Sequence, residues 1–211
     1  MKNLRAIVFD CDGVLFESRA ANLDFYNTIL ARFGAPPVSM ADEATLALCH
    51  TAASPEVLRV LLGEEQLSTA LDYAASLDYR RFVPLLDMEP GLREALTDLG
   101  RDYPLAVATN RGASGEDLLI HFGLREHFSA VVTSRDVPRP KPWPDMLVEA
   151  ARRLGCRTQD MLFVGDSALD RHAALGAGAR FVAYKNDLEG DWRVLSHGQL
   201  VHLVRYGTTG P

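Results

Sequence analysis

Short apolar runs without polar alternation limit the possible folds of this chain more than any other feature. Five such runs lie at residues 5–9, 103–109, 129–134, 161–166 and 179–184. A strand of this kind is typical of a parallel sheet, because both of its faces are buried. The segments between the runs have helical apolar spacing, and one of them, 144–155, has Pro at its first turn and Gly at its end. Alternating strands and helices predict an α/β fold with a doubly wound parallel sheet.

One long segment, residues 18–87, interrupts this alternation directly after the first run. Its apolar residues recur at i, i+3 and i+4, which predicts helices, including a long one over 64–86, and no strand. The stretch DMEPG contains turn residues and predicts the return to the sheet. We therefore expect residues 1–17 and 88–211 to form one α/β domain and residues 18–87 to form an inserted all-helical domain.

The composition argues against several classes of protein. Of the 211 residues, 47% are hydrophobic and 24% are charged, which is ordinary for a globular chain, and the net charge of -6 argues against a general nucleic-acid binder. Three cysteines are too few and too scattered for a disulfide framework or a zinc site. No apolar stretch approaches the roughly 18 residues of a membrane span, and the apolar run near the start is too short for a signal peptide. We expect a cytoplasmic protein that binds neither nucleic acid nor membrane.

Polar residues follow the predicted strands at the points where each strand ends. They are Asp10 and Asp12 after the first run, Thr109 and Asn110 at the end of the second, Lys141 after the third, and Asp166 and Asp170 after the fourth. In an open α/β sheet, ligands bind at the carboxyl ends of the strands. Residues far apart in the sequence are therefore predicted to converge on one site.

This set of side chains suits phosphoryl transfer. Several carboxylates in one pocket need a counter-charge, and Mg²⁺ prefers oxygen ligands of this kind. A lysine, a threonine hydroxyl and the backbone N–H groups of a tight turn at Gly13 are donors suited to phosphate oxygens. One carboxylate can attack a phosphoryl group, and a second can give a proton to the leaving oxygen and later activate water.

Four motifs in family order resemble those of the haloacid dehalogenase-superfamily phosphatases. They are VFDCDGV at 8–14, AVATN at 106–110, KPWPD at 141–145 and GDSALD at 165–170. The helical insertion after the first motif resembles the family's cap, and the stretches ATNR and AYKND resemble the phosphoglycolate-phosphatase-like subgroup. The resemblance implies a Rossmannoid core domain of residues 1–17 and 88–211, and a helical cap domain of residues 18–87.

The resemblance also implies roles for the strand-end residues. Asp10 would be the nucleophile that becomes an aspartyl-phosphate, and Asp12 would be the general acid and base, with its backbone carbonyl on the metal. Thr109 and Asn110 would hold the transferring phosphoryl group. Lys141 would neutralise Asp10 and the phosphate. The implied Mg²⁺ ligands are Asp10, Asp12, Asp166 and Asp170, the last of them directly or through water.

The implied activity is Mg²⁺-dependent hydrolysis of a small phosphorylated metabolite, of the phosphoglycolate or sugar-phosphate class, by a monomer or homodimer. A sugar-phosphate mutase of the β-phosphoglucomutase type would use the same core, and its products would distinguish it. A phospho-acceptor signalling module and a catalytically silent binding protein also stay open. An intact D-x-D argues against a dehalogenase, which would not need Asp12. For Arg111, contact with the leaving group and a surface position at a helix start are both open.

Overall fold

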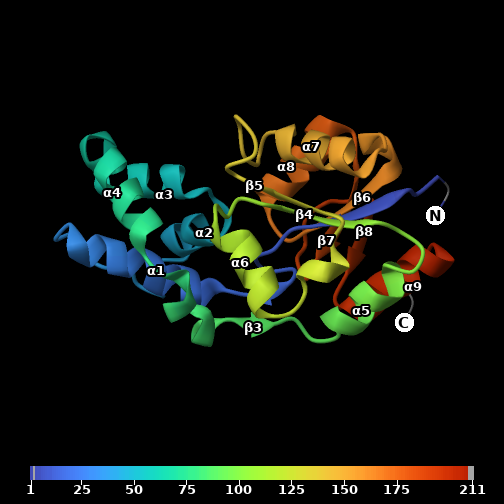
Figure 1. The fold of residues 1–211 in the computed structure, drawn as a ribbon, viewed down its shortest axis with the longest axis horizontal. Helices are drawn as coiled ribbons and strands as arrows, with labels where there is room; N and C mark the ends of the chain where they lie inside the picture. The colour runs from blue at the N-terminus through green and yellow to red at the C-terminus, as the bar shows by residue number, and fades with distance from the viewer. Residues whose placement is uncertain (2, 209–211) are drawn as a thin grey trace. The chain divides into compact units, whose positions relative to one another are not determined.

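The structure is a computed structural model that describes residues 1 and 3–208 (Figure 1). The chain divides into two compact units. One unit comprises Met1–Phe16 and Met88–Pro211, and the other comprises Glu17–Asp87. The chain thus leaves the first unit once, soon after its first strand, and returns to it at Met88.

A six-stranded parallel sheet forms the centre of the first unit, with the strand order β5-β4-β1-β6-β7-β8. The strands are β1 (Ala6–Phe9), β4 (Leu105–Thr109), β5 (Ala130–Thr133), β6 (Met161–Gly165), β7 (Arg180–Tyr184) and β8 (Trp192–Val194). The α/β fold with a doubly wound parallel sheet, predicted from the sequence, is confirmed. All four residues of β1 are buried, because this strand lies between β4 and β6 with side chains packed on both faces.

Within the six-stranded sheet, β8 has no counterpart among the predicted strands, and the short strands β2 (Phe16–Glu17) and β3 (Asp87–Met88) outside this sheet were not predicted either. Its three residues carry an exposed Arg193 between the half-buried Trp192 and the buried Val194. β8 lies at the end of the sheet and pairs with β7. A short edge strand of this kind contains no apolar run, which is why the pattern of buried strands does not reveal it.

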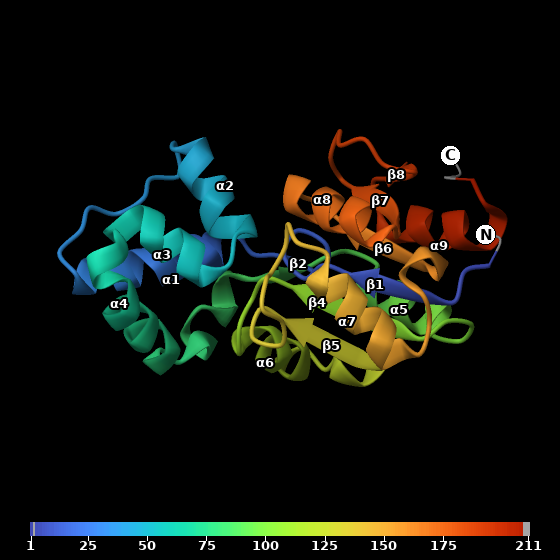
Figure 2. The same cartoon turned by 90° about the horizontal axis from the view of Figure 1, so that it is seen from above.

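Helices cover both faces of the sheet (Figures 1 and 2). In chain order they are α5 (Leu92–Leu99), α6 (Ser114–His121), α7 (Asp145–Leu154), α8 (Ala168–Ala177) and α9 (His197–Tyr206), with the 3₁₀ turns η3 (Arg125–His127) and η4 (Thr158–Asp160). In Figure 1, α7 and α8 lie on one face of the sheet, and α5 and α9 lie together on the other.

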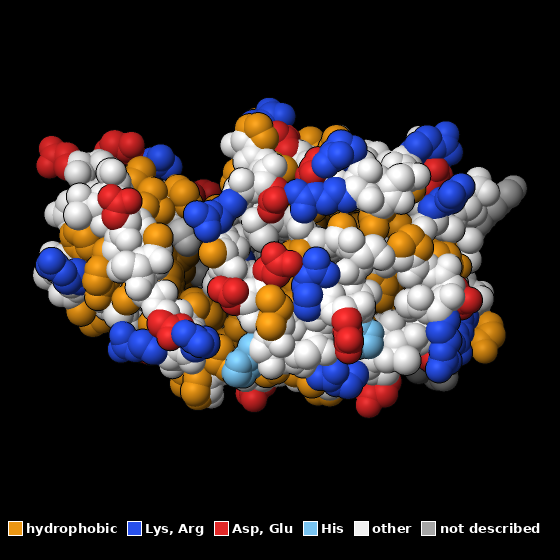
Figure 3. Space-filling model, in the orientation of Figure 1, with side chains coloured by type: hydrophobic (Ala, Val, Ile, Leu, Met, Phe, Trp, Pro, Cys, Tyr) orange, Lys and Arg blue, Asp and Glu red, His pale blue; other side chains and the backbone are white. Residues whose placement is uncertain are grey.

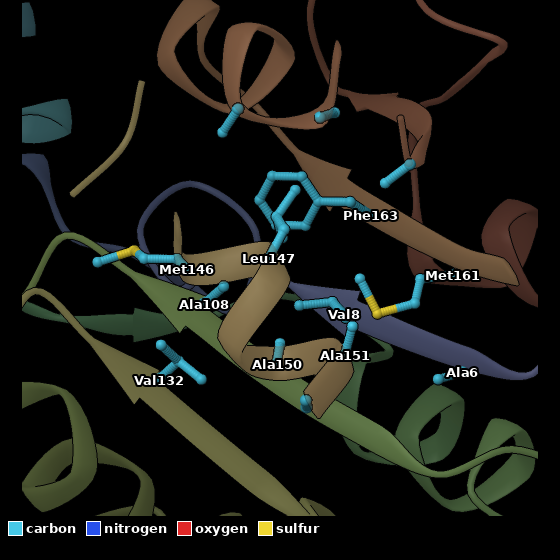
Figure 4. Close-up of a cluster of buried hydrophobic side chains, with 14 of the residues drawn as sticks. Ala6, Val8, Ala108, Val132, Met146, Leu147, Ala150, Ala151, Met161 and Phe163 are labelled. Atoms are coloured by element: carbon cyan, nitrogen blue, oxygen red, sulfur yellow. The ribbon is translucent and has the colours of Figure 1, made fainter. Parts of the chain in front are cut away.

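The core under α7 combines large and very small side chains (Figure 4). Leu147 of α7 and Phe163 of β6 are fully buried beside Val8 of β1. Ala150 of α7 and Ala108 of β4 are also fully buried, and their small size lets the helix lie close to the sheet. This packing fixes the strand ends that carry the polar residues.

The second unit is helical. Its elements are α1 (Arg19–Arg32), α2 (Glu43–Thr51), α3 (Ser54–Leu62), α4 (Glu64–Ser76), η1 (Tyr79–Arg81) and η2 (Val83–Leu85). The long helix predicted over 64–86 ends at Ser76, because Asp78 accepts a hydrogen bond from the Arg80 N–H and starts a 3₁₀ turn. The strands β2 (Phe16–Glu17) and β3 (Asp87–Met88) pair with each other where the chain enters and leaves this unit.

Basic and acidic side chains are interspersed on the face of the first unit that Figure 3 shows. Within residues 1 and 3–208, none of the helices combines the length and the apolar character that crossing a membrane requires.

Candidate active site

The predicted site residues of the first unit lie at the carboxyl ends of four adjacent strands. Asp10 directly follows β1, Thr109 ends β4, Lys141 lies in the loop after β5, and Asp166 directly follows β6. These strands are neighbours in the order β5-β4-β1-β6, so residues from distant parts of the sequence meet at one edge of the sheet.

Lys141 is shared by two carboxylates. Its Nζ lies 2.7 Å from Asp10 Oδ1 and 2.7 Å from Asp170 Oδ1, and the lysine is only 2% exposed. Burial alone would lower the pKa of Lys141, but the charges of Asp10 and Asp170 hold it above its ordinary value. Lys141 therefore stays protonated and supplies the positive charge that these two acids need.

The charge of one lysine does not balance the negative charge of the acidic cluster, which consists of Asp10, Asp166 and Asp170. Burial raises the pKa of Asp10 well above its ordinary value, the charge of Asp170 raises it further, and Lys141 opposes both effects. Carboxylate oxygens of Asp10, Asp166 and Asp170 all lie within 4.8 Å of one another. A group of oxygen ligands with excess negative charge is the environment that a hard divalent cation prefers.

Gly13 leaves the space that the Asp166 side chain occupies. Its φ is +72°, in the region that favours glycine, and a Cβ at this position would lie 1.9 Å from Asp166 Oδ2. The backbone of Asp166 is also fixed, because the Asn186 side chain donates a 2.6 Å hydrogen bond to its carbonyl oxygen. The turn after β1 and the turn after β6 therefore fit together only with glycine at position 13. The oxygen ligands of the acidic cluster, which includes Asp166, fit a bound cation.

Asp170 has structural partners besides Lys141. Its Oδ2 accepts hydrogen bonds from the Ser167 N–H and hydroxyl, and the Ser167 Oγ in turn accepts one from the Asp170 N–H. This reciprocal cap begins α8 and keeps the Asp170 side chain, which is fully buried, beside Lys141.

Asp12 lies against a different partner from Asp10. Arg111 donates from Nε to Asp12 Oδ2 at 2.8 Å and from Nη2 to Asp12 Oδ1 at 2.6 Å. The Arg111 and Asp12 side chains are 7% and 11% exposed. The surface position considered for Arg111 is therefore wrong. The signal available in the sequence was its position, directly after the Thr109–Asn110 pair at the end of a strand.

Thr109 and Asn110 connect neighbouring loops. The Thr109 hydroxyl accepts a 3.1 Å hydrogen bond from the Arg111 N–H. The Asn110 amide makes two bonds to the backbone of Lys141, donating to its carbonyl oxygen at 3.0 Å and accepting from its N–H at 2.9 Å. Asn110 thus holds the Lys141 backbone in place. Whether it also binds a phosphoryl group stays a prediction.

Cys11 is enclosed between the two aspartates. Its side chain is fully buried, its backbone N–H donates to Asp10 Oδ1 at 2.6 Å, and burial strongly raises the pKa of its thiol. An uncharged, enclosed thiol is unreactive, so we assign no catalytic role to Cys11.

Further buried polar residues support the stretch that follows Gly13. His197 Nε2 lies 2.9 Å from the Val14 carbonyl oxygen, and the Glu89 N–H donates to the Leu15 carbonyl oxygen at 3.0 Å. The Glu89 carboxylate accepts from Lys185 at 2.5 Å and from the Tyr184 hydroxyl at 3.1 Å. No local sequence pattern indicates these contacts.

A surface cavity of about 590 Å³ lies beside the edge strand β5, and none of the predicted site residues lines it. Its lining includes Arg125, Arg135 and Arg153. The acidic cluster at the strand ends, rather than this cavity, holds the groups suited to phosphoryl transfer.

Comparison with known proteins finds a hydrolase family model and phosphatase relatives. Residues 7–184 match the family model described as haloacid dehalogenase-like hydrolase. The chain is 33% identical over 187 residues to a phosphoglycolate phosphatase of Rhodobacter capsulatus, covering 85% of this chain and 83% of the relative. It is 29% identical over 229 residues to a phosphoglycolate phosphatase of Chromobacterium violaceum, covering 98% and 99% of the two chains.

Solved structures show the same fold. A haloacid dehalogenase-superfamily hydrolase of subfamily IA, variant 1, from Geobacter sulfurreducens is 38% identical, with a TM-score of 0.83 and coverage of 95% of this chain and 99% of that one. A β-phosphoglucomutase from Clostridium difficile has a TM-score of 0.79 at 18% identity and coverage of 93% of each chain. At that identity the likeness shows a shared fold alone.

Proposed function

Because the chain belongs to the haloacid dehalogenase-like hydrolase family, as a hydrolase of the phosphatase type, we propose that it hydrolyses a small phosphomonoester through an aspartyl-phosphate on Asp10, with Mg²⁺ bound. The observation that carries this proposal is the group of Asp10, Asp166 and Asp170, in which the buried Asp10 and Asp170 share Lys141. Phosphoglycolate is the first candidate substrate, since that is the substrate named for the relatives, and a sugar phosphate is the second.

In the first step Asp10 attacks the phosphorus atom, and the bond between phosphorus and the leaving oxygen breaks. Lys141 remains protonated and reduces the repulsion between the Asp10 carboxylate and the anionic phosphoryl group. We assign Thr109 and Asn110 to holding that group, with Asn110 also fixing Lys141. Asp12 gives a proton to the leaving oxygen.

In the second step Asp12 takes a proton from water, and the resulting hydroxide attacks the phosphorus of the aspartyl-phosphate. This releases inorganic phosphate and restores the Asp10 carboxylate. The clustered carboxylates of Asp10, Asp166 and Asp170 are the groups we assign to Mg²⁺. We assign the Asp12 backbone carbonyl to it as well, as the family resemblance implies. Mg²⁺ held by these groups would neutralise charge on the phosphoryl oxygens.

The domain assignment belongs to the same proposal. Residues 18–87 would form a cap domain, because a helical insertion directly after the first strand corresponds to the family's cap. Residues 1–17 and 88–211 would form the core that carries the catalytic groups. We further propose a cytoplasmic monomer or homodimer that binds neither nucleic acid nor membrane.

The test is phosphate release from a panel of small phosphomonoesters, with and without Mg²⁺, by the wild type, Asp10→Asn and Asp117→Asn. Asp117 is an exposed acid of α6 and serves as the control. We expect Mg²⁺-dependent release by the wild type and the control, none by Asp10→Asn, and a phosphoryl group on the Asp10 peptide of rapidly quenched wild type. Mg²⁺-dependent hydrolysis that survives in Asp10→Asn would exclude this nucleophile. Isomerised sugar phosphate without phosphate release would indicate the mutase instead.

A further inference from the structure

Arg111 and Asp12 form a buried ion pair that the proposed reaction has to open. Arg111 lies in the loop after β4 and Asp12 in the turn after β1, so two adjacent strand ends are joined. The guanidinium binds through two nitrogens, and each Asp12 oxygen accepts one of the bonds, at 2.6 and 2.8 Å. Such a two-bond pair fixes the carboxylate in one orientation.

Held in this way, Asp12 is directed at Arg111. Each of its two oxygens accepts a hydrogen bond from the guanidinium, so the carboxylate is fixed on Arg111 until the pair opens. The pair is also nearly buried, so separating its two charges away from water without a replacement is costly. Another anion that takes the place of Asp12 on Arg111 offsets this cost.

The backbone around Arg111 is fixed, so an exchange would involve the side chain alone. The Arg111 N–H donates to the Thr109 hydroxyl, and the Arg111 carbonyl oxygen accepts from the Ser134 N–H at 3.0 Å and the Ser134 hydroxyl at 3.2 Å. Thr109 is the residue assigned to the phosphoryl group, and Asp12 is assigned to the leaving oxygen. The Arg111 backbone contacts Thr109 and its guanidinium contacts Asp12, so the guanidinium lies on the leaving-group side of the site.

A carboxylate is the anion best suited to such an exchange. Its two coplanar oxygens match the same fork of N–H donors that now binds Asp12. In phosphoglycolate a single methylene separates the carboxylate from the ester oxygen that must receive the proton. A substrate of this kind brings its carboxylate to Arg111 at the same time as it brings its leaving oxygen to Asp12.

We propose that Arg111 is a specificity-determining residue that exchanges Asp12 for a carboxylate on the leaving group of the substrate. The inference rests on the proposed phosphatase function. On exchange, Asp12 turns to the leaving oxygen, where it takes the role assigned to it in the first step of the proposed reaction. A phosphomonoester with an uncharged alkyl leaving group leaves the ion pair closed and reacts slowly.

The test compares phosphoglycolate with ethyl phosphate, which has a methyl group in place of the carboxylate. We expect wild-type kcat/KM to favour phosphoglycolate by about 10²-fold or more, and this preference to fall to within about tenfold in Arg111→Gln. Arg135→Gln changes an exposed arginine in the turn after β5 and should keep the wild-type preference. A preference that persists unchanged in Arg111→Gln would overturn the proposal.

A second measurement uses the wild type alone and does not depend on how well the variant folds. Added acetate should accelerate hydrolysis of ethyl phosphate by occupying Arg111, and it should inhibit hydrolysis of phosphoglycolate competitively. Acetate that inhibits both reactions, or affects neither, would refute the exchange. p-Nitrophenyl phosphate has a leaving group that needs no proton, so its hydrolysis tests the phosphatase function by itself. If it is hydrolysed with Mg²⁺ while phosphoglycolate is not preferred over ethyl phosphate, only the role of Arg111 is refuted. If none of the three esters is hydrolysed, the phosphatase function is refuted as well.

Discussion

His197 makes the stability of this protein depend on pH in a way that can be calculated. The side chain is fully buried, and Nε2 donates to the Val14 carbonyl oxygen, which leaves the lone pair on Nδ1. Nδ1 has no hydrogen-bond partner within the described part of the chain. Burial therefore lowers the pKa of His197 from 6.5 to about 4, although the Val14 carbonyl and Glu89 oppose this shift and Lys185 adds to it.

The sign of the effect follows from where the proton binds. Between a pH of about 6.5 and about 4, the unfolded chain binds a proton at this histidine that the folded protein does not bind. The free energy of unfolding therefore has its full value above about pH 6.5 and decreases as the pH falls. The lowering from 6.5 to about 4 corresponds to about 3 kcal/mol of lost stability.

The assay is urea unfolding of wild type, His197→Gln and His172→Gln at several pH values between about 7.5 and 4.5. His197→Gln also loses the ring contact with Tyr184, so a constant offset is expected. The loss of stability on acidification should nevertheless be smaller in His197→Gln than in the wild type by up to about 3 kcal/mol. His172→Gln, which changes an exposed histidine of α8, should follow the wild type. Parallel pH profiles for His197→Gln and the wild type would refute the reasoning.

Three further predictions concern the acidic cluster and its supports. Lys141→Met leaves Asp10 and Asp170 without their shared cation, so thermal or urea unfolding should show a loss of about 3–5 kcal/mol, and an unchanged midpoint would contradict the shared ion pair. Gly13→Ala places a Cβ on Asp166, so Mg²⁺ affinity measured by calorimetry should fall, whereas Gly123→Ala, in a turn with open space around it, should bind Mg²⁺ like the wild type. Asn110→Ala removes two hydrogen bonds to the Lys141 backbone, so the free energy of unfolding should fall by about 1–3 kcal/mol. The kcat of phosphate release should fall as well. Full activity of this variant would show that Lys141 needs no such support.

The fold was largely predictable because burial on both faces leaves a clear pattern in the sequence. AIVF of β1 and MLFVG of β6 are buried throughout, so their runs contain no polar residue. β8 was missed because its exposed Arg193 and its length of three residues give no such pattern. The predicted helix over 64–86 was too long, because a local hydrogen bond at Asp78 ends the helical run while the apolar spacing continues.

The members of the candidate site were predictable, but their pairing was not. Thr109 ends a strand and Asp10 and Lys141 come after strands, and parallel strands bring their ends together whatever the details of packing. The pair of Arg111 with Asp12 joins residues 99 positions apart, and the bonds of Asn110 to Lys141 span 31 positions. Partners of this kind depend on rotamers and on the register of adjacent strands, for which local sequence patterns carry no signal.

The central place of β1 has a consequence for synthesis of the chain. β1 is made before β4 and β6, yet Ile7 pairs with Leu105 of β4 and with Leu162 of β6. An emerging chain therefore holds AIVF without its sheet partners until β4 and β6 have been made, while the helical segment 17–87 finds its own partners close by in sequence. Pairing between such distant segments is slow and leaves apolar strands exposed to other chains. Asp10 and Asp12, which end this apolar run with two charges, lie where they would oppose its association with other nascent chains.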